Sequence, residues 1–116
     1  MAPLTLAKAK FFPLPNTEIE ISVLQGNPKT GPSAIYMKFP ANYAGSFHTH
    51  THGYHGVLIS GAGLRRVDGV ASENATPISP GDYWYQAGGE RHIDSYTADK
   101  PTIIYTVWEG PIDVSR

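Results

Sequence analysis

Histidine is the residue type that can do chemistry in this chain. Four of the five histidines, His48, His50, His52 and His55, fall within eight positions, and the fifth is His92. Two histidines at positions i and i+2 of a strand project from the same face, with Cα atoms roughly 6.5–7 Å apart. Metal–nitrogen bonds of about 2.0–2.1 Å allow two such imidazoles to meet at one ion. The H-x-H spacing therefore predicts a metal site, whose third ligand must come from another strand.

Three of these histidines form the predicted ligand set: His48, His50 and His92. A histidine-rich loop can also be solvated, or an imidazole can be a hydrogen-bonded core residue, but the H-x-H spacing beside an apolar run favours a shared metal. His52 continues the alternation but lies next to a glycine turn. His55 has the opposite strand parity to Tyr54, so the two side chains are expected on opposite faces. Whether His52 or His55 adds a fourth ligand is left open by the sequence.

The elements that must position these histidines are short strands. Six segments have the alternation, or the β-branched and aromatic content, of strands: 18–23, 34–39, 57–59, 64–67, 82–86 and 102–108. The segments 57–59 and 64–67 are separated by the four small residues 60–63 and predict a hairpin, with a further turn at Asp68-Gly69. No apolar stripe at helical spacing continues for three turns. The pattern predicts an all-β domain, either a sandwich or a closed barrel.

Composition limits the function classes. The chain has 116 residues, 41% hydrophobic and 16% charged, which indicates one small domain. With 9 Lys+Arg against 10 Asp+Glu, we expect no nucleic-acid partner. No apolar stretch approaches the ~20 residues that span a bilayer, so we expect a soluble chain with no membrane partner. The sequence does not identify the compartment: it is cytoplasmic, or periplasmic if a signal peptide has been removed. The absence of cysteine means that any metal must be held by nitrogen or oxygen.

The segments around the histidines resemble the two motifs of the cupin family. The first motif, G-x5-H-x-H-x3–4-E-x6-G, aligns with Asn42, His48, His50, Tyr54 and Gly61. The second motif, G-x5-P-x-G-x2-H-x3-N, aligns with Gly81, Ala87, Gly89, His92 and Tyr96. The chain departs from the pattern at Asn42 for Gly, Tyr54 for Glu, Ala87 for Pro and Tyr96 for Asn.

The resemblance implies a single cupin domain over residues 1–116, with its core motifs at 42–96 and the double-stranded β-helix, or jelly-roll barrel, of that family. It also implies a divalent metal held inside the barrel by His48, His50 and His92. Cupin enzymes of the oxalate, germin and sugar-isomerase kinds use a Glu where this chain has Tyr54. The chain is more similar to the three-His group of acetylacetone dioxygenase and of the ChrR-type barrels.

Three neutral imidazoles leave the full +2 charge of an ion uncompensated, which favours an anionic or chelating small-molecule partner such as an enolate or a carboxylate. With Fe²⁺, up to three positions stay open, enough for a bidentate substrate and dioxygen. With Zn²⁺, the same ligands and one water make a Lewis-acid site. Ni²⁺, Mn²⁺ and Cu²⁺ also suit imidazole. We expect a dioxygenase-like metalloenzyme; the alternative is a non-catalytic small-molecule binding or sensor barrel.

Two further residues are candidates for the chemistry, and one expectation concerns assembly. The phenol of Tyr54 is expected to point inward, where it donates a hydrogen bond to a metal-bound ligand, packs, or binds the metal itself. Gln86 is expected to contact a metal ligand or the substrate, because a buried amide needs partners. A homodimer formed through an edge strand or a sheet face is expected, because β-architectures commonly pair in this way.

Overall fold

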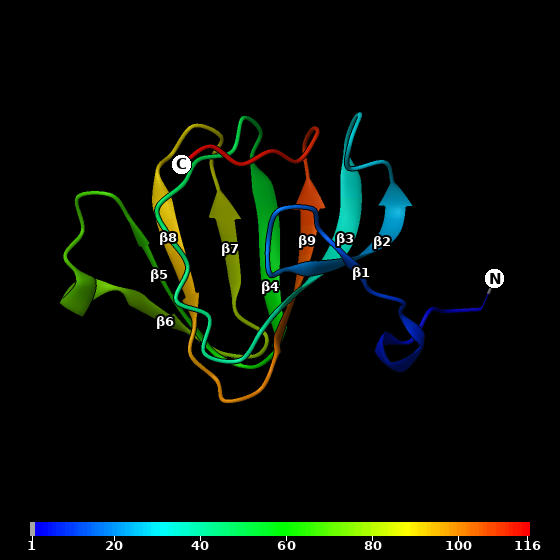
Figure 1. Ribbon diagram of the computed structural model, residues 1–116, viewed down its shortest axis with the longest axis horizontal. Helices are drawn as coiled ribbons and strands as arrows, with labels where there is room; N and C mark the ends of the chain where they lie inside the picture. Colours follow the sequence, from blue (N-terminus) through cyan, green and yellow to red (C-terminus); the bar gives the residue numbers. More distant parts are fainter. Residues whose placement is uncertain (1) are drawn as a thin grey trace.

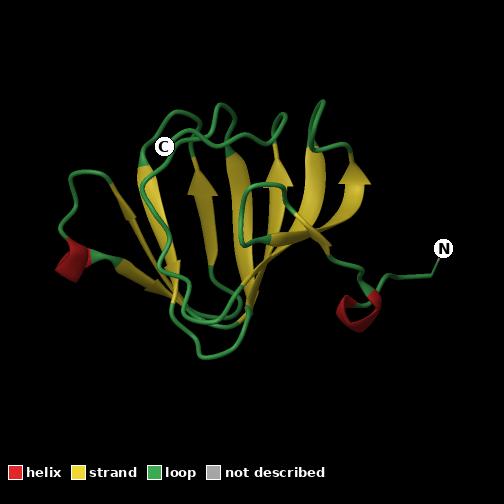
Figure 2. Ribbon diagram, viewed as in Figure 1, coloured by secondary structure: helices red, strands yellow, loops and turns green. Residues whose placement is uncertain are grey.

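Short strands with alternating burial make up most of the structure, a computed structural model that describes residues 2–116 (Figures 1 and 2). The strands are β1 (Phe12–Pro13), β2 (Glu20–Gly26), β3 (Ser33–Phe39), β4 (Tyr54–Ser60), β5 (Gly63–Val67), β6 (Thr76–Ile78), β7 (Tyr83–Gln86), β8 (His92–Tyr96) and β9 (Thr102–Trp108). Two single turns of 3₁₀-helix, η1 (Leu6–Lys8) and η2 (Ser72–Asn74), complete the elements. The prediction of an all-β chain is confirmed.

The strands form two antiparallel sheets. One has six strands in the order β1-β2-β3-β9-β4-β7, and the other has three in the order β6-β5-β8. Strand β3 alternates strictly between buried and half-buried side chains, and β9 follows the same rule along most of its length. This alternation places one face of each strand in the barrel interior, as the period of two requires.

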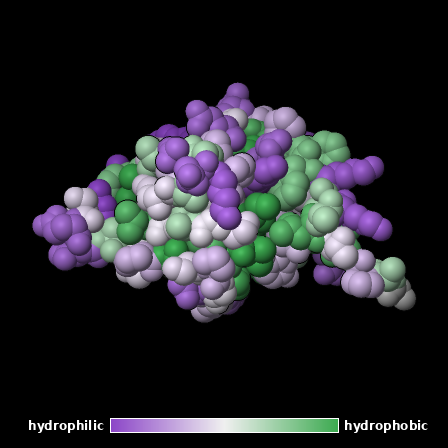
Figure 3. All heavy atoms as spheres, turned by 90° about the horizontal axis from the view of Figure 1, so that it is seen from below, coloured by the Kyte–Doolittle hydropathy of each residue, from purple (hydrophilic) through white to green (hydrophobic). Residues whose placement is uncertain are grey.

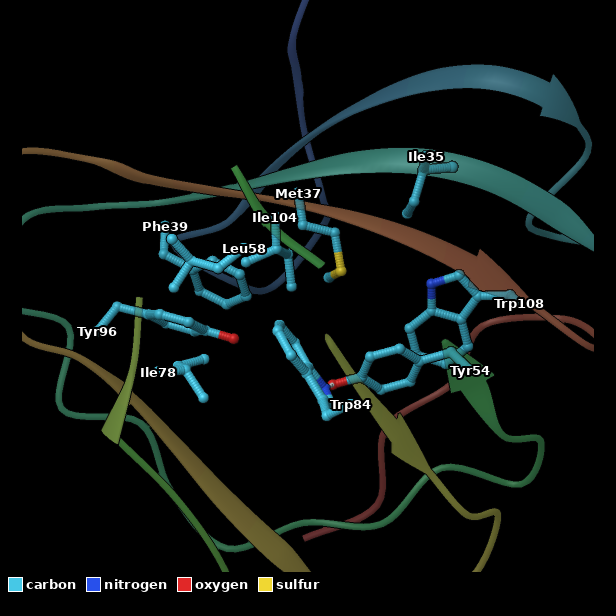
Figure 4. Packing of buried hydrophobic residues seen from close by; sticks show 10 residues of the cluster. All are labelled: Ile35, Met37, Phe39, Tyr54, Leu58, Ile78, Trp84, Tyr96, Ile104 and Trp108. Atoms are coloured by element: carbon cyan, nitrogen blue, oxygen red, sulfur yellow. Dashed lines mark hydrogen bonds between the residues drawn. The ribbon is translucent and has the colours of Figure 1, made fainter. Parts of the chain in front are cut away.

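Aromatic and aliphatic side chains fill the space between the sheets (Figure 4). Ile35, Leu58, Ile104 and Trp108 are each 1% exposed or less. Tyr96, from the smaller sheet, packs its ring 4.2 Å from that of Phe39 on β3. Burial of this kind contributes about 25 cal/mol per Å² of apolar surface. We therefore expect this core to stabilise the barrel without a bound ion.

The structure differs from the local predictions at three points. The segments 57–59 and 64–67 do not form a hairpin, because β4 pairs with β7 and β9 whereas β5 pairs with β6 and β8. The chain crosses between the sheets at Gly61, whose φ of 108° favours glycine. The alternation in 18–23 predicts a buried Val23, but this residue is 47% exposed although it pairs with the buried Ile35; a bulge follows it in the pairing of β2 with β3. Strands β1, β6 and β8 were not predicted.

Asn42 shows how a motif position tolerates substitution. This residue stands where the cupin pattern has glycine, and its φ is 54°. Asparagine is among the non-glycine residues that adopt the left-handed region most readily. Asn42 therefore holds a left-handed backbone position without a glycine.

The surface carries both hydrophilic and hydrophobic residues. In Figure 3 hydrophilic residues gather at the end formed by η2 and the loop between β5 and β6, while hydrophobic and polar residues are interspersed over the rest of the visible face. Phe12 and Tyr83 are the most exposed of the large hydrophobic residues, at 63% and 60%. Within residues 2–116 no helix has the length and apolar character needed to cross a membrane.

Candidate metal centre

The structure brings His48, His50 and His92 together. One ring nitrogen from each lies within 4.8 Å of the others, and the ring centroids are 4.3–5.2 Å apart. His92 is the first residue of β8, and it pairs with His48 through two backbone hydrogen bonds of 3.0 Å. His48 and His50 lie in an extended segment with isolated bridges, rather than in the regular strand that the H-x-H spacing suggested. The extended backbone still directs both rings to one side.

The backbone fixes the orientation of all three imidazoles. The Nδ1 atoms lie 2.7 Å from the carbonyl oxygen of Ser46 for His48, 2.7 Å from that of Asp113 for His50 and 2.8 Å from that of Glu90 for His92. A carbonyl oxygen only accepts, so each Nδ1 carries the proton and donates it. In the neutral ring, each Nε2 then keeps its lone pair. Metal-binding histidines commonly hold their other nitrogen in this way.

Burial and an orphaned atom indicate that these residues fit a divalent ion. His50 is 7% exposed and His92 is 1% exposed, and Nε2 of His92 has no hydrogen-bond partner among residues 2–116. Burial lowers the pKa of His50 to about 4 and also lowers that of His48, so both rings are neutral at pH 7. Neutral imidazole is the form that binds metal. The cluster of three histidine rings suggests a divalent metal site.

Asp94 and Arg65 form a buried ion pair beside the histidines that the sequence analysis missed. Arg65 Nε lies 2.6 Å from Asp94 Oδ1, and the two side chains are 13% and 9% exposed. Burial alone would raise the pKa of Asp94, but His92 and the Arg65 guanidinium outweigh it and hold the pKa below its ordinary value. The signal was present in the sequence, because Asp94 follows His92 by two positions and therefore shares its face.

Tyr54 points inward, as expected, but its hydroxyl is already engaged. It accepts a hydrogen bond of 3.2 Å from Nε1 of Trp84, and its ring stacks on Trp108 with centroids 4.5 Å apart (Figure 4). Burial raises its pKa, so the phenol stays protonated. Its ring contacts that of His50 edge-on, at 5.8 Å. Of the roles considered for Tyr54, these contacts favour packing.

Gln86 is buried, and its amide bonds to residues other than the three histidines. It is 1% exposed, its Oε1 accepts a hydrogen bond of 2.7 Å from Nη2 of Arg65, and its Nε2 donates to the side chain of Glu90 at 3.1 Å. The amide is therefore satisfied by the protein. Through Arg65 it helps to hold Asp94 beside His92.

His52 and His55 lie outside the three-histidine group. Both are exposed. The ring of His52 packs against Gly110, and Nδ1 of His55 is 2.6 Å from the hydroxyl of Tyr83 on the outer face of the larger sheet. Neither side chain lies on the face that carries the cluster. The structure therefore does not position His52 or His55 as a fourth ligand.

A cavity of about 50 Å³ adjoins His48, His50 and Asp94. Its other walls are largely apolar and include Met37 and Trp108. A low-polarity wall strengthens electrostatic interactions between an ion and an anion. The arrangement can therefore hold an ion with open positions facing a small, partly dry space.

Solved structures of similar fold were found. They include KdgF from Halomonas sp., with a TM-score of 0.69 and 18% identity over 90% of this chain and 92% of that chain. The polyketide cyclase RemF from Streptomyces resistomycificus has a TM-score of 0.75 and 15% identity over 100% and 84%. The Cnp3 cupin domain of Schizosaccharomyces pombe has a TM-score of 0.73 and 8% identity over 93% and 68%. At these identities the likeness shows the fold, which is the cupin double-stranded β-helix.

Sequence comparison identifies the family. A search of curated proteins finds no significant match. The model of the family described as "ChrR Cupin-like domain" matches residues 2–113, which is nearly the whole chain. Together with the barrel, this match confirms the resemblance drawn from the two histidine motifs. The chain belongs to the ChrR cupin-like family.

Proposed function

We propose that this cupin binds one divalent first-row transition metal through His48, His50 and His92, and that the ion holds a small oxygenated molecule in the adjoining cavity. One observation carries the proposal: each of the three Nδ1 atoms donates to a backbone carbonyl, so that the Nε2 lone pairs are left for an ion. Buried core histidines without a ligand would be expected to use both ring nitrogens, whereas Nε2 of His92 is unpartnered within residues 2–116.

The substrate class follows from the charge and size of the site. A bound ion supplies positive charge that favours the anionic form of an enolisable or carboxylate compound. The chain itself contributes an apolar wall, in which Met37 and Trp108 exclude water from the bound molecule. Fe²⁺ and Zn²⁺ are the ions we expect first, and with Fe²⁺ we propose dioxygenase-like oxidation of the bound molecule.

One observation favours a second candidate, a metal-dependent binding or sensor barrel without turnover. The cavity of about 50 Å³ is much smaller than the roughly 300–1,000 Å³ of typical ligand pockets. A centre that holds only a very small ligand, such as formate or water, needs no more room than this. Under this alternative the metal binds with the same ligands and no substrate is consumed.

The experiment that tests the proposal uses protein purified without a histidine tag and stripped of metal. The protein is loaded separately with Fe²⁺ and Zn²⁺, and bound metal is counted by elemental analysis. The Fe²⁺ form is then screened for oxygen uptake with β-dicarbonyls and 2-oxo acids, with His92→Ala as the control. One ion per chain with oxygen uptake supports the enzyme, and one ion without uptake supports the sensor. Failure of the wild-type chain to bind either ion would overturn both.

A further inference from the structure

Asp94 places a carboxylate oxygen beside the unpartnered nitrogen of His92. Oδ2 of Asp94 lies 3.5 Å from Nε2 of His92, farther than the roughly 2.7–3.2 Å of a good hydrogen bond. Two ligands of one tetrahedral ion with bonds of about 2.1 Å lie about 3.4 Å apart. The separation of these two atoms therefore matches that of neighbouring ligands of an ion.

The two oxygens of Asp94 have different surroundings. Oδ1 accepts the hydrogen bond of 2.6 Å from Nε of Arg65, whose Nη2 in turn donates to Gln86 at 2.7 Å. Oδ2 faces His92. Carboxylates that bind metals are commonly held in this manner, with one oxygen on the ion and a hydrogen bond that fixes the group. Arg65 is thus a positioning residue for Asp94.

We propose that Asp94 is a fourth protein ligand of the ion, through Oδ2, and that it supplies the charge that Tyr54 does not. The inference rests on the proposed metal binding by the three histidines. Asp94 falls outside the 4.8 Å group that they form, so its carboxylate shifts toward the ion on binding while Oδ1 keeps its bond to Arg65. The centre then carries a charge of +1 instead of +2. A six-coordinate ion would keep two open positions, enough for a bidentate ligand.

The primary test measures Zn²⁺ affinity of the full chain by competition with a chromophoric chelator. Asp94→Asn is expected to weaken Zn²⁺ binding at least 10-fold. Asp68→Asn is the matched control, because Asp68 also pairs with an arginine, Arg91, at 3.0 Å, but on the exposed surface. Its affinity is expected to equal that of the wild type. An Asp94→Asn variant that binds Zn²⁺ as tightly as the wild type would overturn the inference.

A second pair of variants guards against misfolding, because Asp94→Asn leaves a buried arginine without its partner. Arg65→Met and Arg65→Met/Asp94→Asn both lack the guanidinium and differ only at the carboxylate. The single variant is expected to bind Zn²⁺ at least 10-fold more tightly than the double variant, and equal affinities would overturn the inference. A crystal structure of the Zn²⁺-loaded wild type is expected to place Oδ2 about 2.0–2.2 Å from the ion.

Failure of this inference is distinguishable from failure of the proposed function. If the wild-type chain binds no Zn²⁺, or if His92→Ala binds it as well as the wild type does, the metal centre itself is wrong. If His92→Ala loses Zn²⁺ while the removal of the Asp94 carboxylate changes nothing, the three-histidine centre stands and only the fourth ligand is wrong.

Discussion

Nδ1 of His50 donates a hydrogen bond of 2.7 Å to the backbone carbonyl of Asp113, 63 positions away in the sequence. The same C-terminal segment accepts a hydrogen bond from the backbone N–H of Thr51 at the Asp113 carboxylate, and Thr49 pairs with Ser115. Burial opposes charge on His50, and this carbonyl selects its tautomer. The last residues of the chain therefore position a candidate metal ligand.

Removal of residues 111–116 is expected to weaken Zn²⁺ binding by roughly 10–100-fold, the usual cost of losing a hydrogen bond that orients a metal ligand. The barrel should stay folded, because β9 ends at Trp108. Chelator competition measures the affinity, and circular dichroism checks the fold. Removal of residues 2–9, which include η1 but none of the partners of the histidines, is the control. Equal affinities of the two truncated proteins would contradict the role of the C-terminal segment.

The stability of the metal-free protein is expected to fall as the pH decreases from about 6.5 to about 4. Burial lowers the pKa of His50 to about 4 from an ordinary value of 6.5, so within this window the unfolded chain binds more protons than the folded one. Above this window the lowered pKa of His50 makes its full contribution to the free energy of unfolding, on the order of 3 kcal/mol. Urea denaturation at pH 7.5, 6 and 5 measures it. His50→Gln should show a flatter profile; an unchanged pH dependence would count against the assignment.

Alanine substitution separates the candidate ligands from the other histidines. His48→Ala, His50→Ala and His92→Ala should each lower the metal content sharply. The barrel should stay folded, because the buried hydrophobic core contains none of these three histidines. His52→Ala and His55→Ala should retain metal, since both side chains lie outside the cluster. Elemental analysis of dialysed protein gives the metal content. Loss of metal from the His55→Ala variant would show that the three assigned metal ligands are wrong.

Tyr54→Phe is expected to destabilise the fold while leaving metal binding intact. The substitution removes the acceptor of the hydrogen bond from Trp84 and leaves a buried donor unpaired, at a cost of about 1–3 kcal/mol. Thermal denaturation reports the stability, and chelator competition reports the Zn²⁺ affinity. The exposed Tyr83→Phe is the control for loss of a tyrosine hydroxyl. A large loss of Zn²⁺ affinity with Tyr54→Phe would mean that the phenol reaches the ion.

A homodimer is expected through the edge strand β7, which ends the six-stranded sheet and carries Tyr83 and Tyr85 at 60% and 45% exposure. Sedimentation equilibrium should give twice the 12.6 kDa of the chain. Tyr83→Glu should shift the protein toward the monomer by placing a charge in the interface. Leu4→Glu, at an exposed site near the N-terminus, should not. A wild-type protein of monomer mass would refute this mode of assembly.

Much of the fold follows from local sequence pattern. The alternation in 34–39 and the β-branched run in 102–108 predict β3 and β9, because burial on one face of a strand imposes a period of two. The cupin motifs likewise predict the family, and the H-x-H spacing predicts which imidazoles share a face. Nothing local shows that 57–59 and 64–67 join different sheets, since pairing partners depend on the path of the whole chain.

The candidate site also combines features that the sequence predicts with features that only the tertiary structure shows. The sequence by itself determined the three histidines, because their chemistry and their strand parity are local properties. Only the tertiary structure decided what holds them: the carbonyl of Asp113 on His50 and the Arg65–Asp94 pair beside His92. Arg65 meets Asp94 because β5 and β8 pair in a register that no local period encodes. Long-range pairing is set by the closure of the barrel, in which residues far apart in the chain must satisfy one another's buried polar groups.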